Sequence, residues 1–384
     1  MDNSHFGTPS KEWTDYSEAH PGLDMDSDGF SDSVDFPSPT ALRDVANAVK
    51  AASSKALFAR DGLASKVTVT HHSIPTSDGS SITMREYRPI IAATTPAAAA
   101  ADDPLPVYVY FHGGGMLLGT ADGEAWSCAT WAHSLAGAAT PAAVLHVCYR
   151  HTPEATHPRQ HDDAWDAFEW IVANAAATGG GALPGVDPSR LVVGGVSAGA
   201  SLAASVVFRE AALARREGRP GRVAAQLLVI PWLVHRDAYP LHLFADPDRA
   251  SLLQCEASPT LPKPRYDMFT DLCQVRDPRD PLMNVALAEE EELRGTPRTA
   301  IVAVGWDMLR DEAFIYAGKL ERLGCPTKKH IFPGLPHAFR KYPGLPSSVR
   351  WDELIVESLL WCLDEGAEGS TPGDWKIEVP EQYR

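Results

Sequence analysis

A serine between two glycines joins a short buried strand to a long helical segment, and this junction restricts the fold more than any other feature of the chain. The pentapeptide Gly195 to Gly199 fits the pattern G-x-S-x-G. It follows the apolar run 191–193 and precedes a helical pattern over 198–217. So sharp a strand-to-helix turn strains the serine backbone and crowds its neighbours, so small residues must flank it. The junction therefore predicts a strand, a tight turn at Ser197 and a helix in immediate succession.

Strand-like and helical segments alternate along the chain on both sides of this turn. Apolar runs of strand length lie at residues 106–111, 143–149, 191–193, 226–230, 299–304 and 328–332. Helical patterns lie at residues 162–174, 198–217, 311–323 and 347–363. In the first of these helices, Trp165, Phe168 and Val172 form the expected apolar face. The alternation predicts an α/β fold with a mostly parallel sheet flanked by helices.

The N-terminal sixty residues have a different character. Residues 1–40 hold nine acidic side chains and one lysine with little apolar periodicity, so no core element is expected there. Over residues 41–63, Leu42, Val45 and Val49 recur at helical spacing and predict a helix with one apolar face.

Three further stretches interrupt the alternation. Residues 67–87 predict a β-hairpin around the turn Ser77 to Gly79. The low-complexity tract 92–103 predicts an exposed loop. Between Trp232 and Asp277 five prolines break any regular element, and an irregular excursion between two strands suits a cap over a site.

Charge and composition exclude several classes of protein. With 34 Lys and Arg against 50 Asp and Glu, the formal charge is −16, which argues against nucleic acid as the main partner. No apolar run reaches the length of about 18 residues that a membrane span requires. Residues 1–5 lack the features of a secretory signal, which predicts a cytoplasmic location. The six cysteines contain no CxxC pair, so reduced thiols are expected rather than disulfides or a zinc site.

Ser197 is the candidate nucleophile, because a strand-to-helix turn of this kind exposes the serine beside a helix N-terminus. A second glycine cluster, Gly113 to Gly115, ends the strand 106–111. Bare glycine backbone can turn its N–H groups toward an oxygen that becomes negative in a tetrahedral intermediate. The N–H groups of Gly113, Gly114 and Ala198 are therefore the candidate oxyanion hole.

A serine hydroxyl needs a histidine to take its proton and a carboxylate to orient that histidine. On this scaffold the acid precedes the histidine in the chain, which favours Asp307 and His337, each in a loop just after a strand. Asp311 and Glu312 are rivals for the acid, but they fall where a helix N-cap and first turn are expected. The remaining rivals are less well placed: His235, His242 and His330 for the base, Asp277 and Asp280 for the acid.

Five separated blocks resemble the hormone-sensitive-lipase-like branch of the α/β hydrolases, a group of serine carboxylesterases and lipases. The blocks are His112 to Gly115, Tyr149 to Glu154, Gly195 to Gly199, Asp307 to Glu312, and Pro333 to Phe339. The resemblance covers about residues 105–363 and implies the same triad and oxyanion residues. It also implies a cap from residues 1–60 on a catalytic domain of residues 61–384. Within that domain, the irregular excursion 233–276 is the expected cap insertion, and residues 366–384 form a polar tail. Glu154 and Asp163 match positions that we interpret as structural.

Departures from the family pattern border the expected pocket. Val196 stands where the family usually has Asp, Ala200-Ser201 stands where it has Gly-Asn, and Met116 replaces an aromatic residue after the glycines. These differences concern substrate preference more than reaction type. Trp126, Trp131 and Trp306 are candidates to line an acyl or alcohol pocket.

One motif lies outside the family pattern. Asp24, Asp26, Asp28 and Asp35 occupy positions 1, 3, 5 and 12 of an EF-hand-like loop. Against calcium binding, position 12 lacks the bidentate Glu and prolines stand on both sides of the loop. We therefore interpret the segment as a solvated acidic loop.

These observations imply a serine carboxylic-ester hydrolase that acts on a small or medium acyl ester and needs no cofactor. The same site could serve an acyltransferase, a lactonase or an eliminating enzyme of a natural-product pathway, because these differ in which nucleophile reaches the pocket. A ligand-binding receptor on a hydrolase scaffold is the alternative of another class. A receptor of that origin would be expected to have lost a triad member, whereas all three candidates are present.

Overall fold

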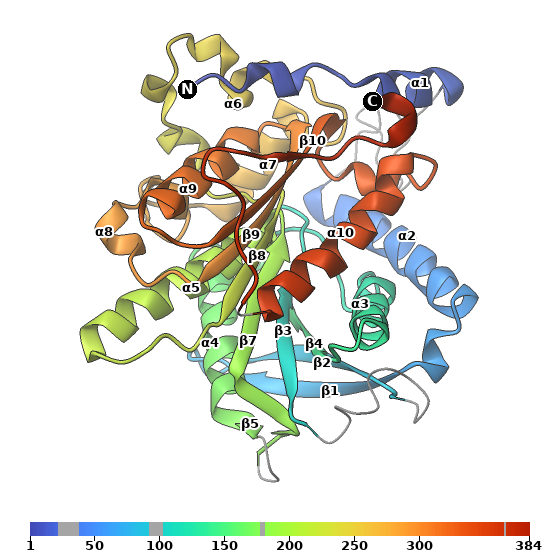
Figure 1. The fold of residues 1–384 in the computed structure, drawn as a ribbon, viewed down its shortest axis with the longest axis vertical. Helices are drawn as coiled ribbons and strands as arrows, with labels where there is room; N and C mark the ends of the chain where they lie inside the picture. Colours follow the sequence, from blue (N-terminus) through green and yellow to red (C-terminus); the bar gives the residue numbers. More distant parts are fainter. Residues whose placement is uncertain (22–37, 92–102, 177–180, 365) are drawn as a thin grey trace.

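The computed structural model describes residues 1–21, 38–91, 103–176, 181–364 and 366–384 (Figure 1). The main strands are β1 (Val67–Pro75), β2 (Ser81–Pro89), β3 (Leu105–Phe111), β4 (Ala143–Cys148), β7 (Val186–Val196), β8 (Ala225–Val229), β9 (Arg298–Trp306), β10 (Thr327–Pro336) and β11 (Lys376–Ile377). Within the described ranges these nine strands form one sheet in the order β1-β2-β4-β3-β7-β8-β9-β10-β11. A separate pair, β5 (Ala175–Ala176) and β6 (Leu183–Pro184), forms a small second sheet.

The sheet is parallel over most of its width. Every neighbouring pair from β4 to β11 is parallel, whereas β1–β2 and β2–β4 are antiparallel. The predicted α/β fold and the predicted hairpin are both confirmed. Because β2 also pairs with β4, the hairpin extends the main sheet. The strands β3, β7, β9 and β10 end at the same edge, which is where open α/β sheets place their ligand sites.

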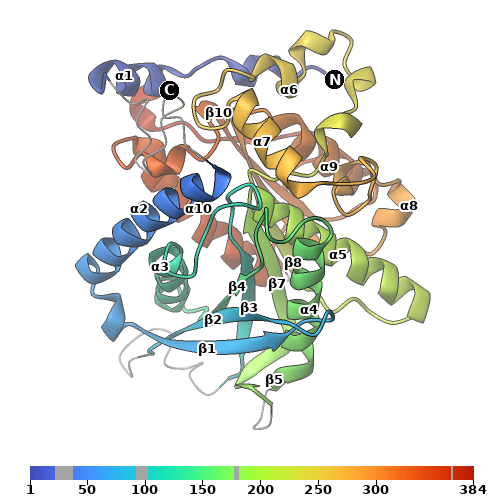
Figure 2. The ribbon, with the colours of Figure 1, turned by 180° about the vertical axis from the view of Figure 1, so that it is seen from behind.

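Helices cover both faces of the sheet, as Figures 1 and 2 show. Along β3, Val107 and Val109 join one apolar cluster and Tyr108 and Tyr110 join the other, which follows from the two-residue period of a strand. The first cluster includes the helices α4 (Arg159–Asn174), α5 (Ala198–Glu217) and α9 (Arg310–Arg322). The second includes α3 (Ala125–Gly137) and α10 (Pro346–Leu363).

The helix α2 (Pro39–Arg60) exists as predicted, but its predicted inner face was right only for Leu42 and wrong for Val45. Leu42, Ala46 and Ser54 are buried, whereas Val45 is 42% exposed. The reason is that α2 packs mainly on α3 and on the loop before it. Its polar side chains face inward and accept backbone N–H groups of the segment after β3, as the Ser54 hydroxyl does from Trp126 at 3.0 Å.

The apolar face predicted for α4 also needs correction. Phe168 is buried as expected, but Trp165 and Val172 are half-buried. The buried apolar residues beside Phe168 are Ala164, Ala167 and Ile171. Small alanine side chains let the helix approach the sheet, which leaves the large indole at the edge of the contact.

The N-terminal segment contributes to the core, contrary to expectation. It forms η1 (Ser4–Gly7) and α1 (Lys11–Ala19), which lie across the ends of β9 and β10 (Figure 1). Trp13 is only 6% exposed, and the buried Glu12 accepts the backbone N–H of Ser347 at 2.7 Å. A single tryptophan in an acidic segment gave no periodic signal, so the sequence pattern did not indicate this packing.

The chain between β8 and β9 is more regular than its prolines suggested. It includes α6 (Ser251–Gln254), α7 (Lys263–Cys273) and α8 (Glu290–Leu293). Pro264 lies in the first turn of α7, where a proline is tolerated because that turn needs no N–H partner. The prediction that no regular element forms here was therefore wrong for α7.

The polar tail is held against the sheet. Residues 376–377 form β11 beside β10, and the buried Glu378 accepts a hydrogen bond from His330 Nδ1 at 2.8 Å. No helix in the described ranges is long and apolar enough to cross a membrane.

Candidate active site

Ser197 occupies the tight turn between β7 and α5 that the sequence predicted. Its backbone has φ 54° and ψ −119°, and its N–H donates to the Val229 carbonyl at 2.8 Å. A non-glycine residue at positive φ costs about 1–3 kcal/mol and persists only where its surroundings hold it. The turn brings the serine to the carboxyl edge of the sheet, where the residue is 9% exposed.

The glycine after this turn has no room for a side chain. A Cβ at Gly199 would lie 2.1 Å from the Phe111 carbonyl oxygen and 2.5 Å from that of His112. We expect Gly199→Ala to lower the free energy of unfolding by about 3 kcal/mol or more, because both contacts are with backbone. Gly221→Ala is the matched control, since a Cβ there meets nothing within 4 Å. Urea unfolding measures the free energy of unfolding of both variants. Equal values for Gly199→Ala and Gly221→Ala would contradict this account of the turn.

Three residues far apart in the sequence meet at the edge of the sheet. His337 Nε2 lies 3.0 Å from Ser197 Oγ, and His337 Nδ1 lies 2.8 Å from Asp307 Oδ2. An ionised carboxylate only accepts hydrogen bonds, so Nδ1–H donates to Asp307 and Nε2 is left to accept the serine hydroxyl. Asp307 Oδ1 accepts the Leu309 N–H at 3.0 Å, which fixes the orientation of the carboxylate.

The glycine loop after β3 borders the same cavity as the serine. Gly113 and Gly114 line the cavity together with Ser197, and Ala198 is the first residue of α5. A Cβ at Gly113 would lie 2.9 Å from the Val196 carbonyl oxygen, so glycine permits the close approach of this loop to the turn. Gly114 has φ 125°, a conformation that favours glycine.

Asp311 and Glu312 lie in the first turn of α9 as expected, but neither caps the helix, which corrects the expected role of these rival acids. Asp311 Oδ2 accepts the Ser251 N–H at 2.7 Å, and Glu312 Oε2 accepts the Val234 N–H at 2.9 Å. Both therefore tie α9 to the segment between β8 and β9. Burial raises the pKa of Glu312 well above its ordinary value despite this hydrogen bond.

The other rivals lie away from Ser197. His330 is bound to Glu378, while His235 and His242 belong to the segment after β8 and do not line the cavity. Asp277 and Asp280 accept the N–H groups of residues two positions ahead, at 2.9 Å in each case, so their predicted role in turns is confirmed. Glu154 and Asp163 form ion pairs with Arg43 and Arg150.

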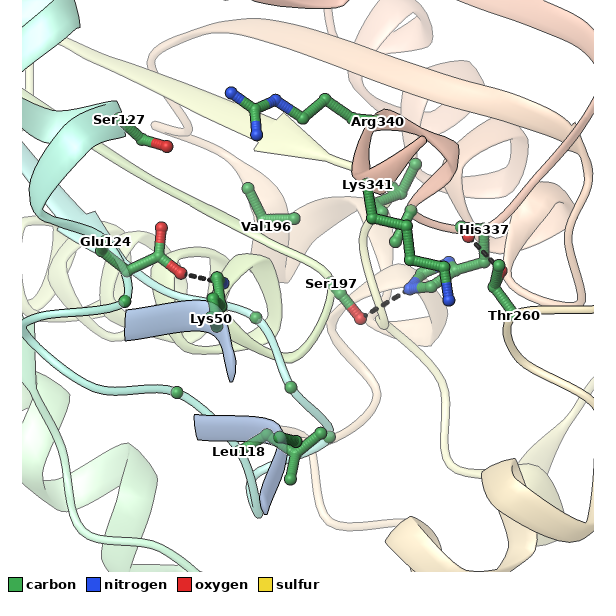
Figure 3. A pocket seen from close by; sticks show the side chains of 18 of the residues that line it. Lys50, Leu118, Glu124, Ser127, Val196, Ser197, Thr260, His337, Arg340 and Lys341 are labelled. Atoms are coloured by element: carbon green, nitrogen blue, oxygen red, sulfur yellow. Dashed lines mark hydrogen bonds and ion pairs between the residues drawn. The ribbon is translucent and has the colours of Figure 1, made fainter. Parts of the chain in front are cut away.

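Two side chains after β8 hold the loops of the candidate triad. Thr260 Oγ1 donates to the carbonyl oxygen of His337, a contact drawn in Figure 3. Ser258 Oγ donates to the Trp306 carbonyl at 2.7 Å, directly before Asp307. Sequence reasoning missed both residues, because the segment containing them has no motif and no regular periodicity.

A cavity of about 390 Å³ opens beside Ser197. Trp126 and Trp131 line it as expected, but Trp306 does not and instead packs against Trp13 at a ring distance of 6.3 Å. Five polar lining residues were not predicted from the sequence: Lys50, Glu124, Ser127, Arg340 and Asp352. They come from separate elements, so no local pattern could have joined them.

The acidic motif with Asp24, Asp26, Asp28 and Asp35 lies outside the described residues, as does the tract 92–102. All six cysteines are free thiols. Over the residues that the structure does describe, no group of three or more His, Cys, Asp or Glu side chains is placed to hold a metal ion.

A mostly parallel sheet with a strained serine at a strand-to-helix turn, hydrogen-bonded to a histidine, defines a hydrolase of the α/β class. The chain belongs to the alpha/beta hydrolase fold family whose model matches residues 108–341. That family includes the hormone-sensitive-lipase-like enzymes, so the resemblance found in the sequence is confirmed.

Named relatives and solved structures agree with this assignment. The versiconal hemiacetal acetate esterase of Dothistroma septosporum is 29% identical over 68% of this chain and 75% of its own. The carboxylesterase NlhH of Mycobacterium tuberculosis is 34% identical over 62% of this chain and 67% of its own. The structure of a bacterial heroin esterase matches with a TM-score of 0.69 and 27% identity, over 94% of this chain and 99% of its own. The chain is thus a carboxylesterase-like α/β hydrolase.

Proposed function

We propose that this protein is a serine carboxylic-ester hydrolase that acts on small or medium acyl esters through an acyl-enzyme intermediate. The observation that supports the proposal most strongly is the continuous hydrogen-bonded chain from Ser197 through His337 to Asp307, with distances of 3.0 and 2.8 Å. Ser197 Oγ attacks the ester carbonyl while His337 Nε2 takes its proton. Asp307 holds the required tautomer and stabilises the imidazolium that forms.

The tetrahedral intermediate places a negative oxygen beside the glycine loop. In this proposal the N–H groups of Gly113, Gly114 and Ala198 donate to that oxygen, and each such donor is worth about 10²–10³ in rate. The intermediate then collapses, and His337 gives its proton to the departing alcohol. A water molecule, activated by the same histidine, attacks the acyl-enzyme and releases the acid.

Two segments form the cap in this proposal. The helix α2 and the segment between β8 and β9 both contribute lining residues to the cavity beside Ser197, which supports the cap expected from residues 1–60 and 233–276. Covering the serine limits the water that reaches the acyl-enzyme and strengthens the electrostatic contacts inside the cavity.

The proposal predicts hydrolysis of p-nitrophenyl esters with a preference for short or medium acyl chains. In a series from acetyl to dodecanoyl, kcat/KM should peak at or below the octanoyl ester, because a cavity of about 390 Å³ must hold both parts of the ester. Initial rates of p-nitrophenolate release give the profile. A maximum at the dodecanoyl ester would contradict the size assignment, and an absence of hydrolysis across the series would contradict the proposed reaction.

A further inference from the structure

The cavity beside Ser197 is lined by both apolar and charged side chains. Its apolar lining residues include Leu118, Trp232, Leu261, Phe269 and Leu309. A group of its polar lining residues, which we term the polar wall, consists of Lys50, Glu124, Ser127, Arg340 and Asp352. In Figure 3, Lys50, Glu124 and Ser127 lie across Ser197 from Thr260 and His337.

Glu124 is the most buried member of the polar wall. Its side chain is 5% exposed, and its carboxylate is paired with the ammonium of Lys50, a side chain that is 43% exposed. Tyr110 donates its hydroxyl to Glu124 Oε2 at 3.2 Å. Burial alone would raise the pKa of Glu124, but Lys50 and the neighbouring histidines hold it at about 2. The wall therefore keeps an ionised carboxylate beside the serine.

A second ion pair lines the same cavity. Arg340 donates to both oxygens of Asp352 at 2.9 and 3.2 Å, and its guanidinium lies 4.5 Å from the ring centre of Trp126. The wall thus contains two cations and two carboxylates, each cation beside one carboxylate. It offers both hydrogen-bond donors and acceptors to a group that enters the cavity.

The composition of the wall restricts what can lie against it. An alkyl group would remove water from these charges without replacing the lost hydrogen bonds. The resulting desolvation of the charged groups opposes binding of such a group. An anionic group would meet the carboxylates of Glu124 and Asp352 as well as the cations. A neutral hydroxyl group can accept from Lys50 or Arg340 and donate to a carboxylate, so it satisfies both kinds of partner.

We propose that the substrate is an ester with one apolar portion and one portion that carries neutral hydroxyl groups. The hydroxylated portion lies against the polar wall, and the apolar portion lies against the apolar lining residues of the cavity. This inference rests on the proposed function, because Ser197 sets the position of the ester carbonyl in the cavity that both groups of residues line. The polar wall makes Lys50 and Glu124 specificity-determining residues.

Two isosteric pairs of esters test the inference, one for each side of the ester bond. Glyceryl 1-monobutyrate is compared with 2-methylbutyl butyrate, and ethyl 3,4-dihydroxybutyrate with ethyl 3-methylpentanoate. In one of the two pairs, kcat/KM should favour the hydroxylated ester by about tenfold or more, because buried polar groups discriminate against analogues that lack their partners. A ratio within about twofold in both pairs would overturn the inference.

Variants of the wall show whether it is the source of the preference. The ratio of kcat/KM for the hydroxylated ester to that for its apolar analogue should fall by about fivefold or more in Lys50→Met and in Lys50→Met/Glu124→Gln. The double variant is included because it leaves no buried carboxylate without its cation. Lys55→Met is the matched control, since Lys55 is exposed on the same helix and does not line the cavity. A preference that persists in both wall variants would overturn the assignment to Lys50 and Glu124.

A binding measurement distinguishes failure of this inference from failure of the proposed hydrolysis. Calorimetric titration of Ser197→Ala with the same esters measures the preference without turnover. A binding preference without hydrolysis by the wild-type protein would overturn the proposed function and support the polar wall. Hydrolysis or binding that favours monoethyl succinate over ethyl 3,4-dihydroxybutyrate by more than about tenfold would overturn the neutral assignment in favour of an anionic group.

Discussion

Replacing Ser197 by alanine should lower the kcat of ester hydrolysis by about 10⁴- to 10⁶-fold, because the acyl-enzyme cannot form without the hydroxyl. The substitution removes one oxygen atom and keeps Cβ, so the strained turn and its hydrogen bond from the Ser197 N–H to Val229 should remain. The residual rate comes from binding and from the oxyanion donors. Release of p-nitrophenolate from the butyryl ester measures the loss, and circular dichroism checks the fold.

Ser201→Ala is the matched control for this experiment. Ser201 lies one turn further along α5, is buried at 1% exposure, and its Oγ has no hydrogen-bond partner in the described part of the chain. Its loss should leave kcat within about threefold of the wild-type value, as is usual for a small change away from the reacting atoms. Equal activity of Ser197→Ala and wild type would discard Ser197 as the nucleophile.

The candidate triad could be found in the sequence because each member stands just after a strand. Ser197, Asp307 and His337 follow β7, β9 and β10, and parallel neighbouring strands bring their carboxyl ends to one edge. The alternation of strands and helices could also be predicted, since it depends on local apolar periodicity. The sequence could not predict the distances of 3.0 Å between Ser197 and His337 and 2.8 Å between His337 and Asp307.

The polar wall shows where sequence reasoning fails. Lys50 comes from α2, Glu124 from the turn before α3, and Arg340 from η8 (Phe339–Lys341), so their meeting depends on tertiary packing alone. The same limit explains why the apolar face predicted for α2 is only partly buried. A helix that docks through Asn47 on a loop and through Ser54 on α3 does not need an apolar stripe, so apolar periodicity does not identify its inner face.

Asp307→Asn should lower kcat by about 10⁴-fold while the protein stays folded. The amide oxygen can replace Oδ1 as the acceptor of the Leu309 N–H, so the amide nitrogen then faces His337 Nδ1. That nitrogen donates a hydrogen bond and cannot accept one, which forces the proton of the imidazole onto Nε2. His337 then cannot accept the proton of Ser197. Steady-state kinetics give kcat, and thermal unfolding verifies that the loss is not one of structure.

The variant Asp311→Asn tests whether Asp307 or Asp311 is the acid of the triad. Asp311 is fully buried, pairs with Arg310 at 3.0 Å and accepts the Ser251 N–H, but it does not contact His337. Loss of its charge leaves the Arg310 guanidinium buried beside an amide, so the melting temperature should fall while kcat stays within about tenfold of wild type. If Asp311→Asn abolished turnover and Asp307→Asn did not, the acid would be Asp311, and the 2.8 Å contact between Asp307 and His337 would be structural.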